Sequence, residues 1–198
     1  QLPELPQEKR ERFHAQYEFS YADAALLTRD YDLANYTEKI MSELQAWVES
    51  MTQEDESKAD KKRLAKLGAN WLINDLAPRI EHQWENMPIT PENFAEFIAL
   101  IAESKINSSA AQQVLDSMVK TGKDPSDIVA EENLTQVGDS DELGAIVQKV
   151  IIENEKVAED YKSGKENAIK FLLGAVMRYT QGRANPQIVE ELLKKTLV

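Results

Sequence analysis

The sequence predicts an all-α protein. Glycine is scarce, with 7 among 198 residues, and no run alternates apolar and polar residues between turn signals. Apolar residues instead recur at spacings of three and four, which place them on one face of a helix. The chain is long enough for two small domains, and its 42% hydrophobic content suffices for buried cores. We expect two small helical domains, residues 1–88 and 89–198.

The first predicted domain begins with the linker-like segment Leu2-Pro3-Glu4-Leu5-Pro6, which suggests a piece of a longer protein. The segment Glu54–Arg63 is highly charged, and its polar start predicts a solvated loop or a frayed turn. Pro78 permits a kink or an end in the last helix. The helix signals cover four segments: the residues after Pro6, Tyr21–Thr28, Leu33–Met51 and Leu64–Leu76.

The second predicted domain begins at Met87–Pro91, where two prolines interrupt any helix. Three dipeptides each put a side-chain oxygen at an N-cap and proline at the first helical position, where its missing N–H costs nothing. These dipeptides start three helices and are Thr90-Pro91, Asp124-Pro125 and Asn185-Pro186.

Two glycines are placed to end helices of this domain in the left-handed conformation. Gly122 follows a predicted helix over Ser108–Lys120, and Gly182 follows one over Lys165–Gln181. Between them, the acidic run Asp139–Glu142 complements the dipole at the start of another helix. We therefore expect about six short helices in this domain.

The charge of the chain is unevenly distributed. Its formal net charge is −12, which argues against a nucleic-acid partner because backbone binding is driven by Lys and Arg. Residues 160–198, however, carry +3, so the remainder carries −15. A basic end on an acidic body suits a partner with one strongly charged face.

No catalytic constellation is present in the sequence. The chain has no cysteine, and its two histidines, His14 and His82, lie in polar contexts that predict surface positions. No glycine-rich loop of the kind that cradles phosphates occurs. With 35 acidic residues, chance carboxylate pairs are inevitable, so we predict no catalytic residues and no metal site. No run of about 18 apolar residues and no signal peptide are found, so we place the chain in the cytoplasm with no membrane partner.

One helix face carries a partner hypothesis. Lys170, Gly174 and Arg178 are spaced four apart, so they share a face of the predicted helix. A glycine inside a helix lowers helix stability by about 1 kcal/mol relative to alanine, so its presence needs a structural or functional explanation. A sugar-phosphate backbone could approach closely over the bare glycine, with the two cations at phosphates. Alternatively, Gly174 lets another helix pack close by, and the cations only flank that contact.

Two further features invite an RNA interpretation. Trp47 and Trp71 fall on apolar stripes and predict core positions, whereas Trp84 lies in a polar stretch and is a candidate for base stacking. The turn Gly182–Pro186 precedes a helix whose first N–H groups offer an anion site. A well-capped helix-turn-helix explains the same turn residues completely.

The order of several motifs closely resembles the C-terminal region of the B subunits of aspartyl/glutamyl-tRNA amidotransferases, including their YqeY-like tail. The upstream motifs resemble the segment that joins the family's catalytic cradle to its tail. The order of all these motifs along the chain is more specific than any single motif. The motifs are Leu2–Pro6, Tyr21–Thr28, Asn70–Leu72, Thr121–Pro125, Asp160–Lys165, Phe171–Met177, Gly182–Pro186 and Leu192–Lys195.

The resemblance implies a role in a heterotrimer that amidates Glu-tRNA(Gln) or Asp-tRNA(Asn), using ATP and ammonia from glutamine. The family's helical and tail domains hold the tRNA body, and the tail recognises its outer corner by shape. The cradle that binds ATP and Mg has no counterpart in this sequence, so we expect no cofactor and no catalysis from this chain alone. The implied partners are tRNA(Gln) or tRNA(Asn) and the A and C subunits, and not DNA.

The basic residues of the tail are the RNA-binding candidates. A free-standing YqeY-like protein would explain the second half of the chain but not Leu2 to Trp84, and an all-helical protein-interaction module with no RNA role is the more distant alternative. The candidate residues are Lys162, Lys165, Lys170, Gly174, Arg178, Arg183, Lys194 and Lys195.

Overall fold

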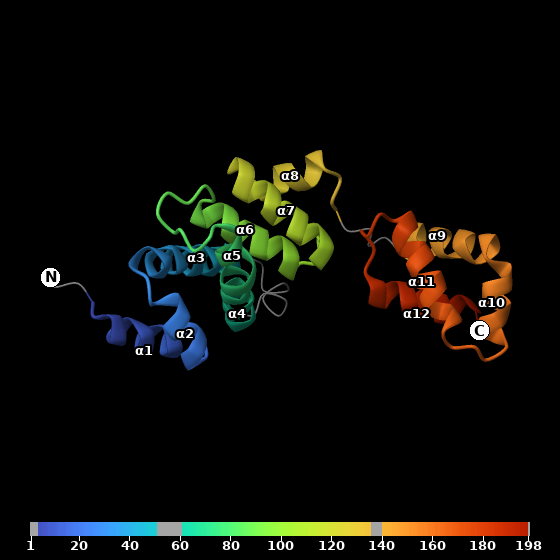
Figure 1. The fold of residues 1–198 in the computed structure, drawn as a ribbon, viewed down its shortest axis with the longest axis horizontal. Helices are drawn as coiled ribbons and strands as arrows, with labels where there is room; N and C mark the ends of the chain where they lie inside the picture. The colour runs from blue at the N-terminus through green and yellow to red at the C-terminus, as the bar shows by residue number, and fades with distance from the viewer. Residues whose placement is uncertain (1–3, 51–60, 136–139, 198) are drawn as a thin grey trace. The chain divides into compact units, whose positions relative to one another are not determined.

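A computed structural model describes residues 4–50, 61–135 and 140–197 of the chain. Within these three ranges the secondary structure is helical and no strand forms, which confirms the predicted all-α class (Figure 1). The chain divides into two compact units. Unit 1 comprises Gln1–Ser104 and Ala111–Glu132, and unit 2 comprises Lys105–Ala110 and Asn133–Val198.

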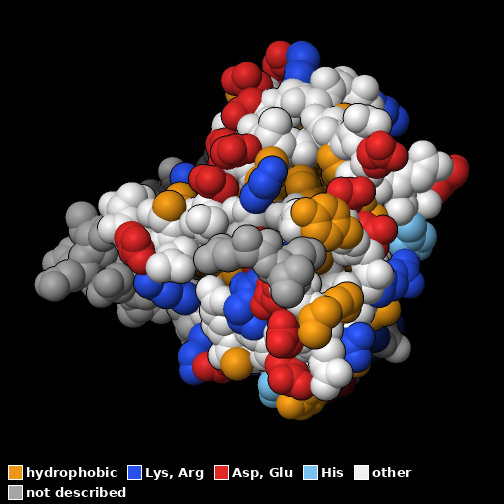
Figure 2. Space-filling view, turned by 90° about the vertical axis from the view of Figure 1, so that its left-hand side faces the viewer, with side chains coloured by type: hydrophobic (Ala, Val, Ile, Leu, Met, Phe, Trp, Pro, Cys, Tyr) orange, Lys and Arg blue, Asp and Glu red, His pale blue; other side chains and the backbone are white. Residues whose placement is uncertain are grey.

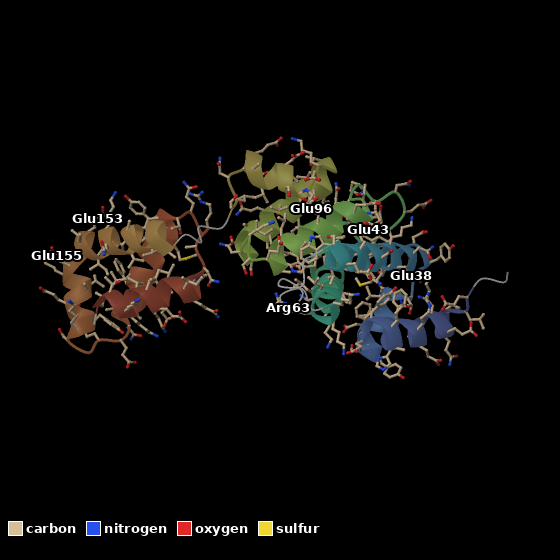
Figure 3. The ribbon with its side chains drawn as sticks, turned by 180° about the vertical axis from the view of Figure 1, so that it is seen from behind. Glu38, Glu43, Arg63, Glu96, Glu153 and Glu155 are labelled. Atoms are coloured by element: carbon tan, nitrogen blue, oxygen red, sulfur yellow. The ribbon has the colours of Figure 1, made fainter. Side chains whose placement is uncertain are left out.

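Unit 1 is built around the long helix α3, which packs against α4 and α6. Trp71 and Phe97 meet edge to face in its core, with ring centroids 5.1 Å apart. Hydrogen bonds tie the helices together, for example from Arg63 to the carbonyl of Ala102 at 3.1 Å (Figure 3). The helices are α1 (Pro6–Tyr17), α2 (Tyr21–Leu27), α3 (Tyr31–Ser50), α4 (Lys61–Trp71), α5 (Ala77–Arg79), α6 (Pro91–Ala102), α7 (Ser108–Thr121) and α8 (Pro125–Glu131).

A π-helical turn over Leu72–Leu76 joins α4 to the short α5. The prediction that Pro78 permits a kink fits this arrangement, because the π turn loosens the hydrogen-bond ladder just before the proline. Arg79 then reaches α7, where its Nε donates to Asp116 Oδ1 at 2.6 Å. The irregular turn is therefore fixed to a neighbouring helix by a charged hydrogen bond.

Unit 2 contains α9 (Ser140–Glu153), α10 (Glu155–Lys162), α11 (Ala168–Tyr179) and α12 (Pro186–Leu197). In this unit α11 packs against each of the other three helices. The shared core is aliphatic and consists of Leu143, Val147, Val150, Ala158, Ile169, Leu172, Val176, Ala184, Val189, Leu193 and Leu197.

The main boundary between the compact units falls between residues 132 and 133, with the short segment Lys105–Ala110 also assigned to unit 2, whereas the sequence suggested a boundary near residue 88. Helices on both sides of residue 88 belong to unit 1, because α6 packs on α3 and the Tyr36 hydroxyl donates to the carbonyl of Ile89 at 3.0 Å. The division into family domains 1–88 and 89–198 stays a prediction.

The three predicted N-caps are confirmed. Side-chain oxygens of Thr90, Asp124 and Asn185 accept hydrogen bonds from the backbone N–H groups of residues 93, 126 and 187, at 3.2, 2.9 and 2.9 Å. Proline occupies the first position of each helix that follows, α6, α8 and α12. These starts were predictable because a cap is a local interaction.

The predicted glycine stops are also confirmed, with φ of 67° at Gly122 and 77° at Gly182. One helix start was predicted wrongly, because α11 begins at Ala168 and not at Lys165. Gly164 adopts φ of 95°, and the N–H of Ala168 bonds to the carbonyl of Lys165 at 3.0 Å in a tight turn. Lys165 therefore precedes the helix.

Some predictions fall on residues that the structure does not describe. The start of the charged segment Glu54–Arg63 lies outside the described residues, as do Leu2 and Pro3 of the linker motif. Asp139 and the side chains of residues 140–142 are also outside them, so the acidic first turn of α9 stays a prediction. In the part of the chain that is described, no helix is long and apolar enough to cross a bilayer.

The contact between α6 and α8 supplies a test of the fold. Burial raises the pKa of Glu96 above its ordinary value, and the nearby carboxylates of Asp124 and Asp127 add to the increase. Because the folded pKa is the higher one, the ionised side chain destabilises the fold, and the free energy of unfolding falls as pH rises through 4.5 and above. We predict that Glu96→Gln gains stability over the unchanged protein at pH 7, and that the gain disappears in acid. Chemical denaturation across this pH range measures it, and a difference independent of pH would contradict the assignment.

Candidate RNA-binding surface

The inner side of α11 is apolar and its outer side is open. Ile169, Leu172 and Val176, spaced by three and four residues, are buried, the last two with 0% exposure. Lys170 and Arg178 lie on the opposite side and are exposed, as the helical period requires. Packing of the first face against α9, α10 and α12 therefore holds the second face outward.

Gly174 lies in open space on this outer face. A Cβ atom built on it would meet no atom within 4 Å beyond its own helix and its chain neighbours, among the residues described. Gly68 shows the opposite case, because a Cβ there would lie 3.4 Å from Met41 Cε and 3.5 Å from Leu44 Cδ1. Close helix packing explains Gly68, and it does not explain Gly174.

Four of the eight candidate residues are exposed cations without a bonding partner. Within the described ranges, their side chains form no hydrogen bond, ion pair or contact with an aromatic ring. Two of them, Lys170 and Arg178, share the face of α11 with Gly174, which places the residues of the proposed phosphate contact together. The four are Lys162, Lys170, Arg178 and Lys195.

Two other candidate lysines are paired with carboxylates. Lys165 Nζ lies 2.8 Å from Asp160 Oδ1, and Lys194 Nζ lies 2.6 Å from Glu190 Oε1 on the next turn of α12. The hydrogen bond that Lys194 donates to Glu190 raises the pKa of Lys194 above its ordinary value. Both ammonium groups stay largely exposed to water, where such pairs are weak and easily exchanged for another anion.

Arg183 is held along its own turn. Its Nε donates to the carbonyl of Thr180 at 3.2 Å, and its Nη1 donates to the carbonyl of Asn133 at 3.4 Å. The side chain is half-buried, so its guanidinium is less available than that of Arg178. The anion site predicted at the start of α12 stays a prediction, since the Asn185 cap accounts for the turn without a ligand.

The tryptophan prediction was wrong at one position. Trp84 is only 7% exposed and lies beside Tyr36, with ring centroids 6.1 Å apart, so no base can stack on it from outside. The polar residues next to Trp84 in the sequence suggested an exposed ring, but residues distant in sequence cover it. Trp71 is buried as predicted, while Trp47 is half-buried and Val48 takes the core position beside it.

The sequence analysis missed an exposed aromatic residue on α11. Phe171 is 50% exposed and lies three residues before Gly174 and seven before Arg178. Spacings of three and seven also keep side chains on one helix face, so a search that used both three and four would have found it. The outer face of α11 thus combines two cations, a glycine and an aromatic ring.

The two histidines each contact neighbouring residues of unit 1. His82 is exposed, as predicted, and its Nδ1 lies 3.3 Å from Arg29 Nη2. His14 is half-buried, with Nδ1 2.6 Å from the carbonyl of Phe19 and its ring stacked on Tyr21 at 4.0 Å. His14 therefore belongs to the junction of α1 and α2, where it is held by local contacts.

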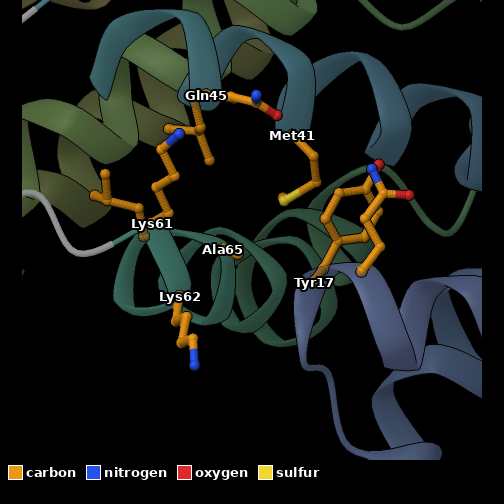
Figure 4. Close-up of a pocket in the computed structure, with 9 residues that line it drawn as sticks. Tyr17, Met41, Gln45, Lys61, Lys62 and Ala65 are labelled. Atoms are coloured by element: carbon orange, nitrogen blue, oxygen red, sulfur yellow. The ribbon is translucent and has the colours of Figure 1, made fainter. Parts of the chain in front are cut away.

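A small pocket lies where α1, α3 and α4 meet (Figure 4). Tyr17 and Met41 point toward each other across it, while Lys62 points away. Its volume is about 110 Å³, which is below the roughly 300 Å³ of ordinary ligand sites. Lys61 at its rim is paired with Glu49 at 3.3 Å. The pocket offers no cradle for a nucleotide.

The described residues thus form a helical fold, and α11 of unit 2 presents an exposed face that carries two cations. A family model described as "GatB domain" matches residues 34–197, which is most of the chain and includes α11. The chain therefore belongs to the GatB domain family.

Curated relatives are named as the B subunit of aspartyl/glutamyl-tRNA(Asn/Gln) amidotransferase. Those from Caldanaerobacter subterraneus and Herpetosiphon aurantiacus are each 38% identical to this protein, over 99% and 100% of its chain. The relative from Clostridium beijerinckii is 36% identical over 99% of the chain. In each case the chain spans 38% of the length of the relative.

The open space around Gly174 gives a stability test. We predict that Gly174→Ala raises the free energy of unfolding by about 1 kcal/mol, because alanine favours the helix and its methyl group meets nothing. Thermal or chemical unfolding measures the change.

Two further glycines serve as controls. Gly144→Ala in α9 should give a similar gain, because its Cβ also meets nothing within 4 Å. Gly122→Ala should lose stability, because φ is 67° and the new Cβ would lie 2.8 Å from the carbonyl oxygen of Pro88. A loss of stability in Gly174→Ala would show that another element packs over this glycine.

Proposed function

We propose that this chain is the tRNA-contacting helical part of the B subunit of a tRNA amidotransferase, and that α11 carries the contact. One observation supports the site most directly. Lys170 and Arg178 are exposed, lack partners in the described structure, and lie on either side of a glycine with open space above it. Membership of the GatB domain family supports the choice of tRNA.

The proposed contact is electrostatic and depends on close approach. The two cations are eight positions apart, which corresponds to about 12 Å along a helix, so they can reach different phosphates of one backbone. Between them, the missing side chain of Gly174 lets the backbone come close to the helix surface. Such contacts position a folded RNA without reading its sequence, as recognition by shape requires.

The names of the relatives support a proposal for the substrate and the other partners. We propose that the parent complex amidates Glu-tRNA(Gln) or Asp-tRNA(Asn) with glutamine and ATP, and that it contains A and C subunits. We assign ATP and Mg to other parts of the parent enzyme. Among the described residues, no group of three or more His, Asp or Glu side chains is placed to hold a metal ion.

A protein-interaction module without an RNA role is the second candidate, and one observation favours it. Unit 1 exposes large apolar side chains near its first helices, and Figure 2 shows hydrophobic side chains among charged ones on this side of the molecule. A protein partner could cover such side chains. They are Leu5, Tyr21, Leu26 and Tyr31, which are 61%, 63%, 41% and 74% exposed.

Charge reversal on α11 tests the proposal. We predict that the chain binds unmodified tRNA transcript weakly and that affinity falls steeply with added salt. The double variant Lys170→Glu with Arg178→Glu should bind roughly tenfold or more weakly, and the slope of log affinity against log salt should fall by about 2, one for each lost phosphate contact. Gel shift at several salt concentrations measures both quantities.

The matched control is Lys39→Glu with Lys120→Glu, which changes the net charge equally at two exposed lysines of unit 1. It should lower affinity only slightly. Thermal unfolding should be nearly the same for both double variants, because none of the four side chains is buried. Equal binding by the α11 variant and its control would remove α11 as the contact, and no binding of tRNA at any salt would favour the protein-interaction module.

A further inference from the structure

The ring of Phe171 is the most exposed aromatic surface that the described part of unit 2 offers to a ligand. Half of the side chain is exposed, and within the described ranges its ring contacts no other aromatic ring and no cation. Aromatic rings normally bury most of their area, so a bare ring on a polar helix face costs free energy unless a partner covers it.

Tyr179, at the end of the same helix, makes a useful contrast. It is 46% exposed, similar to Phe171, but the ammonium of Lys149 lies 4.8 Å from its ring centroid. The interaction with Tyr179 also raises the pKa of Lys149 above its ordinary value. The ring of Tyr179 is thus occupied from within the protein, and the ring of Phe171 is available.

The neighbours of Phe171 indicate what could cover it. It follows Lys170 directly and shares its helix face with Gly174 and Arg178. Exposed cations without partners on both sides make this an unfavourable place for an apolar protein surface, because docking would desolvate the charges. A nucleotide suits both the ring and the cations, since the flat face of its base stacks on an aromatic ring while the phosphates of the strand stay with the cations.

We propose that Phe171 stacks on an unpaired nucleobase of the RNA whose phosphates Lys170 and Arg178 hold. This inference rests on the proposed function and makes it more specific, because it selects a looped or unstacked segment over a regular duplex. In a duplex both faces of nearly every base are covered by its neighbours. In a loop a face is free, and the open space over Gly174 lets the strand come near enough for the base to reach the ring.

The test compares Phe171→Leu with Tyr179→Leu in the full 198-residue chain. Leucine keeps an apolar side chain but removes the flat ring. We expect Phe171→Leu to weaken binding of a tRNA transcript about tenfold, the size of one lost base-aromatic stack. The salt slope should stay unchanged, because no phosphate contact is lost. Tyr179→Leu should bind within about twofold of the unchanged chain, and the helix content of both variants should be normal by circular dichroism.

A long RNA duplex without loops is the second probe. The unchanged chain and Phe171→Leu should bind it equally, since it presents almost no free base face. Unchanged affinity of Phe171→Leu for tRNA, or an equal loss for tRNA and duplex, would overturn the stacking. The proposed function is judged separately, because charge reversal at Lys170 and Arg178 would still lower the salt slope if only the stacking were wrong.

Discussion

The burial of one face of α11 is the interaction on which the proposed site depends. Leu172 and Val176 are completely buried among α9, α10 and α12, and burial of such side chains contributes roughly 1.5–3 kcal/mol each. Because the helical period is fixed, this packing also fixes which residues face outward. The cations, the open glycine and the bare ring are therefore arranged by the hydrophobic core of unit 2.

The acidic composition of the chain and a phosphate-binding face are compatible. At physiological ionic strength charges are screened over about 8 Å, so carboxylates farther away than this affect a bound phosphate little. Phosphate binding therefore depends on which cations of unit 2 are already paired with a carboxylate close by. Asp160 and Glu190 pair with Lys165 and Lys194, whereas Lys170 has no such neighbour among the described residues. The pairing pattern leaves Lys170 and Arg178 of α11 available, together with Lys162 of α10 and Lys195 of α12.

The parts of the structure that were predicted from sequence are those set by neighbours along the chain. The Asp124 cap and the left-handed Gly182 depend on a few adjacent residues, and both were found. Trp84 was misjudged because distant residues bury it, and the start of α11 was misplaced because a turn at Gly164 intervenes. The open space over Gly174 could not be inferred at all, since it depends on where every other helix lies.

Mapping the contact on the chain by NMR is the most direct test of the central claim. Backbone amide resonances of the 198-residue chain would be followed while tRNA transcript is added. The account predicts that the largest shifts and losses of intensity fall on α11, from Lys170 to Tyr179, with smaller effects at neighbouring cations of unit 2. Changes confined to unit 1, with α11 unaffected at saturation, would contradict it.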